Sequence, residues 1–196
     1  MDAYDMRSYG IGKGPSATTV SVQDDVIALS GSVLLKGMVT DVSAGTKDDF
    51  IISRFPNGVS AVSDASMSDW MLYVYKGFAV PSNATGVEVI VEVFDPNSNY
   101  YEVGRTTSDA SGFYSLPFTP EVPGEYTVVA RFAGTKSYWP SYGETAINVG
   151  EAATATPVPT NPPASLADQY LLPGIGIIVA AIAVVGAVIV LMLRKR

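Results

Sequence analysis

The chain has 196 residues, of which 19 are acidic and 12 are basic, and it contains neither cysteine nor histidine. Disulfides, thiolate chemistry, Ser-His-Asp triads and His-liganded zinc sites are therefore excluded. The net charge of −7 argues against nucleic acid and anionic lipid surfaces as partners.

Residues 1–14 show no signal peptide, because acidic residues come early and no apolar run follows. A C-terminal membrane anchor without a signal peptide would leave most of the chain in the cytoplasm, which conflicts with the topology argued below. Either the orientation inferred from the basic tail is wrong, or the true start lies upstream of Met1. We favour the upstream start and expect residues 1–14 to be the remnant of an upstream domain.

Residues 15–150 are predicted to form an immunoglobulin-like antiparallel β-sandwich of about seven strands. Apolar residues alternate with a period of two, and turn-forming residues separate the apolar runs. Tyr126 stands near the start of one run, at the place of the tyrosine corner of such domains. The predicted strands span residues 18–23, 33–42, 87–94, 100–107, 112–118, 126–132 and 145–149.

An amphipathic helix is predicted over residues 63–75, where apolar residues recur at helical spacing from Met67 onward. Ser66, followed three residues later by Asp69, resembles a capping box. We expect the face that carries Trp70 to pack over one open end of the sandwich.

Asn83-Ala-Thr85 is the one Asn-X-Ser/Thr sequon of the chain. It stands in a turn-like stretch just before a strand, so we expect Asn83 to be a candidate for N-glycosylation outside the cell.

Asp95, Asn97 and Asn99 place oxygen ligands at alternate positions, as the start of a calcium loop does. The sixth and twelfth positions carry Tyr and Thr instead of the Gly and Glu of an EF-hand, which excludes that motif. Asp109 in the next turn could complete a weak calcium site. The alternative is a hairpin turn capped by Asx side chains. No other cofactor is expected.

Glu88 and Glu92 alternate on one face of a predicted strand. A glycosidase needs two carboxylates across a cleft, and no element here is expected to build one. We predict a solvated face, no catalytic residue and no enzymatic activity.

Tyr138, Trp139 and Tyr142 cluster around a proline between the last two strands. Aromatic faces with polar edges bind sugar rings, so these residues are a candidate glycan contact. The alternative is that Trp139 fills the end of the sandwich and the tyrosines bond to the backbone.

Residues 151–170 are rich in Pro, Thr and Ala and predict an extended stalk. A transmembrane helix is predicted over residues 171–193, because the twenty residues from Gly174 to Leu193 contain no charge and no proline. At about 1.5 Å per residue, twenty residues cover the roughly 30 Å hydrocarbon core of a bilayer.

The basic tail Arg194, Lys195 and Arg196 follows the predicted span at once. Lys and Arg favour the cytoplasmic side, so we expect a single-pass protein of the cell membrane with its N-terminal domain outside. The lipid bilayer is then its first partner.

Small residues at Gly176, Ala180, Ala183 and Ala187 follow one face of the predicted span. This spacing lets membrane helices approach closely and makes a homodimer through the span a candidate.

Residues 12–19, 54–59 with 68–71, and 132–142 resemble a recurring archaeal surface module. In that family an immunoglobulin-like domain precedes a Thr/Pro stalk and one membrane helix, and it often follows a β-propeller of the pyrroloquinoline-quinone-like repeat type. Residues 3–12 resemble the last strand of such a propeller. The resemblance implies the membrane-proximal end of a larger surface protein, and it brings no catalytic residue and no bound quinone.

These features favour a membrane-anchored extracellular module that spaces and presents a surface domain. One alternative is an adhesion module that binds glycan or calcium. The other is the accessory domain of a surface enzyme whose catalytic part lies upstream.

Overall fold

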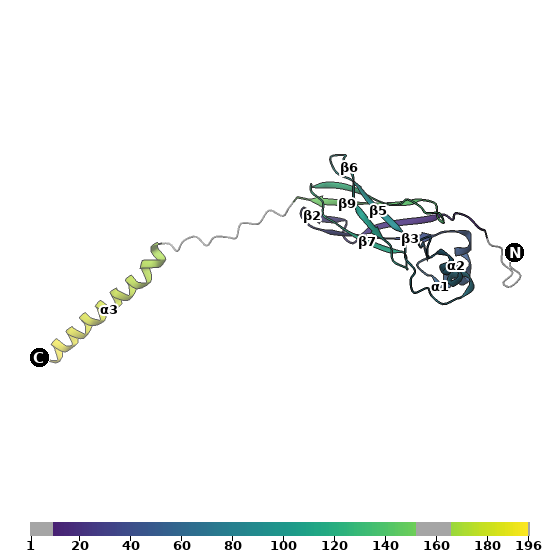
Figure 1. Cartoon of the computed structure of the whole chain (residues 1–196). Coiled ribbons are helices and arrows are strands. Elements are labelled where there is room, and N and C mark those ends of the chain that lie inside the picture. The colour runs from purple at the N-terminus through teal and green to yellow at the C-terminus, as the bar shows by residue number, and fades with distance from the viewer. Residues whose placement is uncertain (1–9, 152–165, 196) are drawn as a thin grey trace. The chain divides into compact units, whose positions relative to one another are not determined.

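The computed structural model describes residues 10–151 and 166–195 (Figure 1). The predictions for the first nine residues, for most of the stalk and for Arg196 lie outside these residues. The chain divides into two units, Met1–Ala153 and Thr154–Arg196, which are described separately. We refer to the first as the β domain.

The β domain contains all seven predicted strands and two further short ones, β2 and β4. The strands are β1 Ser16–Val22, β2 Val26–Ala28, β3 Val33–Asp41, β4 Val59–Ser60, β5 Glu88–Phe94, β6 Tyr100–Thr107, β7 Phe113–Phe118, β8 Gly124–Phe132 and β9 Ser141–Gly150.

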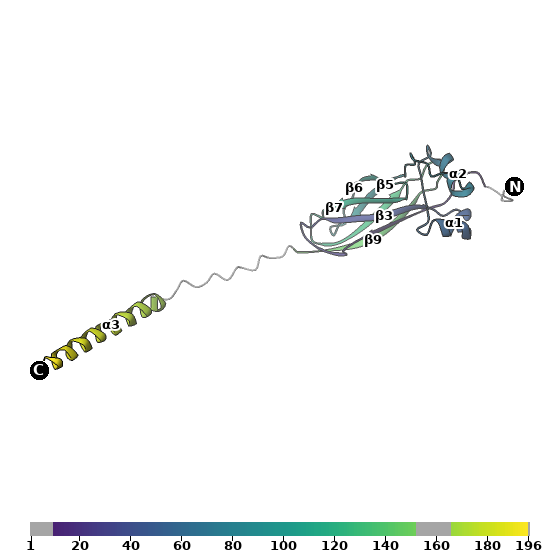
Figure 2. The same ribbon diagram turned by 90° about the horizontal axis from the view of Figure 1, so that it is seen from below.

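Two sheets stack to form the sandwich (Figure 2). In the first sheet β3 is central, with β1 on one side and β7 and β4 on the other. The second sheet has the order β2-β9-β8-β5-β6. All pairs are antiparallel except β2 with β9. This division of consecutive strands between two sheets is an immunoglobulin-like β-sandwich.

The core lies between the two sheets and is made by alternate residues of the central strands. Their side chains are almost completely buried, and the large ones come from both sheets. They include Leu35 and Val39 of β3, Val89, Val91 and Val93 of β5, Tyr114 and Phe118 of β7, and Tyr126, Val128 and Phe132 of β8.

Tyr126 forms the predicted tyrosine corner. Its hydroxyl donates to the Val122 carbonyl and accepts from the Val122 amide, both at 3.1 Å. Its ring is fully buried and meets Phe118 edge-on, with the ring centroids 5.6 Å apart. The corner therefore ties the β7–β8 connection to the core.

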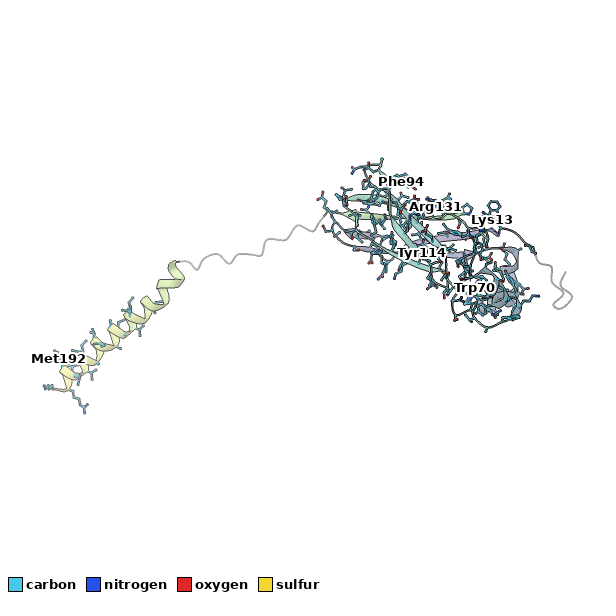
Figure 3. All side chains as sticks on the ribbon, in the orientation of Figure 1. Lys13, Trp70, Phe94, Tyr114, Arg131 and Met192 are labelled. Atoms are coloured by element: carbon cyan, nitrogen blue, oxygen red, sulfur yellow. The ribbon has the colours of Figure 1, made fainter. Side chains whose placement is uncertain are left out.

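Two helices stand between β3 and β5, α1 at Asp49–Arg54 and α2 at Met67–Lys76, preceded by a 3-10 turn at Ala44–Lys47. They carry a second, smaller core made by Ile51, Val59, Val62, Trp70 and Val74. Figure 3 shows Trp70 within this helical part.

Helix α2 begins four residues later than predicted, and its capping box does not form. Ser66 makes no side-chain cap bond to the helix, because its hydroxyl accepts a hydrogen bond from the Thr85 amide at 3.1 Å. Trp70 packs against α1 in the second core, and the contact with the sandwich core comes from Met67, which touches both cores.

The helices are fastened to the loop between β8 and β9. The Asp64 carboxylate accepts from the Ser137 hydroxyl at 2.7 Å and from the Lys136 and Ser137 amides at 3.1 Å each. Burial raises the pKa of Asp64, but these hydrogen bonds outweigh it and lower the pKa below its usual value. The carboxylate is thus charged at neutral pH, as the amides require.

The chain enters and leaves the sandwich at opposite ends. Gly14 pairs with the β8–β9 loop, because its amide donates to the Ser137 carbonyl at 2.9 Å. The same loop binds Asp64 of the helical part. We call this end the helical pole. Strand β9 then runs the length of the sheet to Gly150, which pairs with β2 at the other end. We call that end the exit pole.

The second unit contains helix α3, Leu166–Arg194. Its segment Gly174–Arg194 has a mean hydropathy of 3.1 and is long and apolar enough to cross a membrane. The helix begins five residues before the predicted span, so its first turn lies in the stretch that the sequence assigned to the stalk.

We predict that Tyr126→Phe lowers the free energy of unfolding by about 1–2 kcal/mol, because the Val122 amide and carbonyl lose their partner. Denaturant unfolding of the full chain in detergent micelles measures this. Both tryptophans, Trp70 and Trp139, lie in the β domain, so their fluorescence reports on it alone.

Tyr142→Phe is the matched control, since Tyr142 is 69% exposed, and it should change stability by less than about 0.5 kcal/mol. Equal effects of the two substitutions would contradict a structural role for the corner.

Candidate functional site

Asp95 caps the hairpin between β5 and β6. Its carboxylate accepts from the Asn97 and Asn99 amides at 2.9 and 2.7 Å and from the Asn99 side-chain amide at 2.7 Å. Hydrogen bonding from the Asn99 side chain is the main cause that lowers the pKa of Asp95. This is the Asx-capped turn that stood as the alternative to a calcium loop.

Asp109 caps the β6–β7 turn with the same pattern. Its carboxylate accepts from the amides two and four residues later, Ser111 at 2.8 Å and Phe113 at 3.0 Å. In both turns the fourth residue has a positive φ, 66° at Ser98 and 84° at Gly112. The two turns are therefore copies of one local structure.

The structure separates the four predicted calcium ligands. The Asp95 turn lies at the exit pole, where Pro96 adjoins Gly124, and the Asp109 turn lies at the helical pole, where the Ser60 hydroxyl bonds to the Ala110 carbonyl. Strand β6, with eight residues, spans roughly 25 Å between them. Asp109 thus cannot complete a site with Asp95, Asn97 and Asn99. No group of three acidic side chains that could hold a metal occurs among the described residues.

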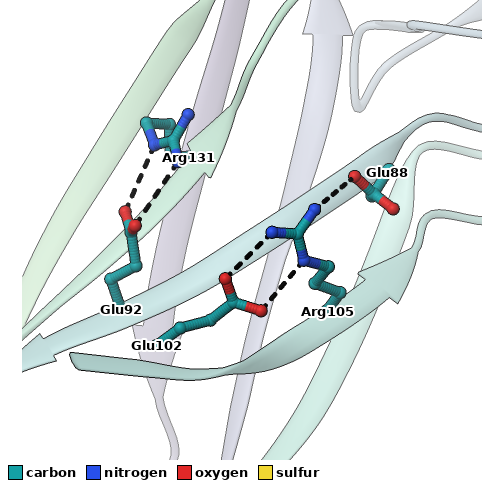
Figure 4. Close-up of polar contacts among 5 residues, drawn as sticks. All are labelled: Glu88, Glu92, Glu102, Arg105 and Arg131. Atoms are coloured by element: carbon teal, nitrogen blue, oxygen red, sulfur yellow. Dashed lines mark hydrogen bonds and ion pairs between the residues drawn. The ribbon is translucent and has the colours of Figure 1, made fainter.

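Glu92 is not solvated as the sequence predicted. It is only 8% exposed, because Arg131 of β8 lies across it on the outer face of the second sheet (Figure 4). The Arg131 Nε donates to Glu92 Oε2 at 3.2 Å and Nη2 donates to Oε1 at 3.4 Å. The prediction was wrong because it considered β5 without the strand that pairs with it.

A second arginine on the same face binds Glu88 and Glu102 (Figure 4). Arg105 Nε and Nη2 donate to the two Glu102 oxygens at 2.9 and 3.0 Å, and Nη1 donates to Glu88 at 3.3 Å. All three side chains are at least 40% exposed, so these contacts add little stability. Here the predicted solvated face is present.

The ion pair fixes the charge of Glu92. Hydrogen bonds from Arg131 lower the pKa of Glu92, and the Glu92 carboxylate in turn raises the pKa of the Tyr100 hydroxyl beside it. Glu92 and Arg131 are therefore both charged at neutral pH, and neither side chain is poised for proton transfer.

The side chains of Tyr138, Trp139 and Tyr142 lie in different environments. Tyr138 is 2% exposed and meets Phe132 in the core, so it cannot contact an external glycan. Trp139 does not fill the end of the sandwich, because it is 56% exposed. Only Trp139 and Tyr142 of the predicted set present their rings to solvent.

Trp139 is held firmly by its backbone. Its amide donates to the Gly14 carbonyl at 2.9 Å, and its carbonyl accepts from the Ser16 hydroxyl at 2.7 Å. The Lys13 ammonium lies 5.1 Å from the centre of the indole ring, within cation–π range. The Trp139 surface is thus an exposed ring with a cation over it, at the helical pole.

Two residues of these surfaces were missed by the sequence predictions. The alternation of β8 places Arg131 on the outer face of the sheet. Only the β5–β8 register shows that it meets Glu92. Lys13 precedes the first strand and reaches Trp139 through the pairing of Gly14 with the β8–β9 loop. Neither contact has a local sequence signal.

Asn83 and the small residues of the predicted span lie in the kinds of element in which they were expected. Asn83 is exposed in a turn between α2 and β5. Gly176, Ala180, Ala183 and Ala187 all lie in α3, and their role in helix association stays a prediction.

No protein-family model and no curated protein matches the chain. Among solved structures, it is similar to the CARDB domain of the PF1109 protein from Pyrococcus furiosus, crystallised with di-metal ions. The TM-score is 0.35 at 11% identity, over 74% of this chain and 99% of that domain. A β-glucosidase from Listeria innocua in complex with glucose gives the same score and identity over 74% of this chain and 17% of its own length. Likeness at this level carries no argument about function, and the fold is defined by the strand order.

We predict that Glu92→Gln lowers stability by about 1 kcal/mol at pH 7. Because the pKa of folded Glu92 lies below its ordinary value of 4.5, the contribution is complete above that pH and is lost as the pH falls through the folded pKa. Denaturant midpoints measured from pH 7 down to pH 3 should therefore converge for the two proteins.

Glu102→Gln, at an exposed ion pair, is the control and should differ little from the parent at every pH. A deficit of Glu92→Gln that stays constant down to pH 3 would contradict the ion-pair explanation.

The paired turns give a second test. Ser98→Gly should stabilise the domain by up to about 1 kcal/mol, since relief of the left-handed backbone, about 1–2 kcal/mol, exceeds the entropy cost of glycine. Gly112→Ala should destabilise by more than about 1 kcal/mol, because its Cβ would lie 2.8 Å from the Val39 carbonyl. Thermal unfolding of both variants measures the two effects. A Ser98→Gly variant that is less stable than the parent would contradict the strain assigned to the left-handed residue.

Proposed function

We propose that this chain is a membrane-anchored extracellular module, without catalytic activity of its own, that spaces and presents a surface domain. The observation that carries the proposal is the path of the chain. It enters the β domain at the helical pole, leaves at the exit pole, and ends in an apolar helix followed by basic residues.

A module with its two ends at opposite poles works as a spacer. Strand β9, with ten residues, spans about 33 Å, so the points at which the chain enters the β domain, near Gly14, and leaves it, at Gly150, are separated by about this length. A domain whose termini lay at one end would add no such separation. The tyrosine corner and the fastening of the helices by Asp64 favour a stiff unit.

The charge distribution fits the same role. The described tail residues Arg194 and Lys195 are basic, which favours a cytoplasmic C-terminus and an external β domain. The resemblance of residues 12–19 and 132–142 to archaeal surface modules supports a preceding propeller as the presented partner and a Thr/Pro stalk below the domain.

A second candidate, an adhesion module, is favoured by Trp139. An exposed indole held through its backbone and accompanied by Lys13 suits the apolar face of a sugar ring. A calcium-dependent form has less support, because the Asp95 and Asp109 carboxylates already cap their turns.

The anchor is tested by placing charges at the middle of α3. The variant carries both Ile182→Arg and Val185→Arg, and each substitution should cost about 2.5–3.5 kcal/mol of insertion free energy. Together they should move the full chain from the carbonate-resistant membrane pellet to the supernatant. Centrifugation and immunoblotting of the two fractions measure this.

Ile182→Leu with Val185→Leu is the matched control and should stay in the pellet. If the doubly charged variant also stays in the pellet, or if the unchanged chain is soluble, α3 is not the anchor and the proposal fails.

A further inference from the structure

A hollow of about 350 Å3 lies beside α2, at the surface of the helical part. It is lined by Asp69 and Leu72 of the helix and by the segment from Phe78 to Asn83. Phe78 and Val80 are 60% and 62% exposed, and Leu72 is 39% exposed. Large apolar side chains gathered around one exposed hollow are typical of a surface that contacts another group.

The sequon asparagine stands on the rim of this hollow. Asn83 itself lines it and is exposed, so its side-chain amide is open to modification. The sequon threonine is bound to Ser63 by two contacts. The Thr85 hydroxyl lies 2.7 Å from the Ser63 hydroxyl, and the Thr85 carbonyl accepts a hydrogen bond from the Ser63 amide. The turn that carries Asn83 is thereby held against the start of the helical segment.

We propose that the hollow is the seat of an N-linked glycan on Asn83. The first pyranose ring packs its apolar face on Phe78 and Val80 and turns its hydroxyls toward Asp69 and Ser82. This inference rests on the proposed external location of the β domain, where glycosylation takes place.

The covalent step is the ordinary N-glycosyl transfer from a polyprenyl-phosphate-linked oligosaccharide. The Asn83 amide nitrogen forms a bond to the anomeric carbon of the donor sugar and loses one proton. The bond from that carbon to the lipid phosphate breaks, and the phosphate leaves with the electron pair. No oxidant or reductant is needed.

Size and tethering favour an attached sugar over a separate protein. The volume lies at the low end of small-molecule sites, about 300–1,000 Å3, which suits one sugar ring. A group linked at the rim has an effective concentration of millimolar order or more, so a weak contact between ring and aromatic side chain is populated. A glycan on Asn83 would also bar a protein partner from the hollow.

The test is a thermodynamic cycle on the full chain produced in its organism of origin. Asn83→Gln removes the glycan and Phe78→Ser removes the floor of its seat while keeping the sequon. Four proteins are compared, the parent, each single variant and the double variant, by thermal unfolding in detergent with tryptophan fluorescence. Mass spectrometry of the Asn83 peptide gives the glycan occupancy of each.

We expect the glycan to raise the unfolding midpoint of the parent by about 2–4 °C over Asn83→Gln, and to raise it by less than 1 °C in the Phe78→Ser background. Val80→Ser replaces Phe78→Ser if the latter does not fold. An equal rise in both backgrounds, or no rise in the parent, would overturn the seat.

The location of the domain is measured on the same cells with added protease. A protease-accessible domain with an unmodified Asn83 overturns this inference and leaves the proposed function intact. A domain that the protease cleaves only after the cells are lysed overturns both.

Discussion

Contact between two apolar sheet faces holds the β domain together, since the chain has no cysteine for a disulfide. Strands β5 and β8 supply most of the second sheet's share, and the Tyr126 ring with its hydroxyl locks the β7–β8 connection onto them. Because both strands cross the whole sandwich, the loops fall into two separate sets at its ends. The course of the chain from pole to pole, on which the proposed spacing depends, follows from this packing.

The same packing decides what the polar groups can do. The Asp95 and Asp109 turns cap opposite ends of β6, so their carboxylates serve the backbone at two poles. Glu92 is covered by Arg131 and stays charged. Exposed apolar or aromatic side chains lie around Trp139 and beside Asn83 at the helical pole, and Phe94 packs against Tyr100 at the exit pole. This distribution supports the proposed presenting module.

Patterns local in sequence predicted most of the fold. Period-two alternation located seven strands, and the position of Tyr126 predicted its corner. Contacts between strands far apart in the chain were not predictable in this way: Arg131 over Glu92 depends on the β5–β8 register, and β2 is too short to show a period. Trp139 is exposed instead of filling the end of the sandwich, and its neighbour Tyr138 is buried in the core. Two adjacent residues in an irregular loop have no periodicity that could assign their sides.

The most direct test of the central claim is the side of the membrane on which the β domain lies. Since the chain lacks cysteine, Gln23→Cys in an exposed loop of the β domain and Lys195→Cys beyond α3 each give one labelling site. Intact cells are treated with a membrane-impermeant maleimide and compared with lysed cells. If the β domain is external, Gln23→Cys is labelled in intact cells and Lys195→Cys only after lysis. The reverse pattern would place the β domain in the cytoplasm and contradict the proposed function.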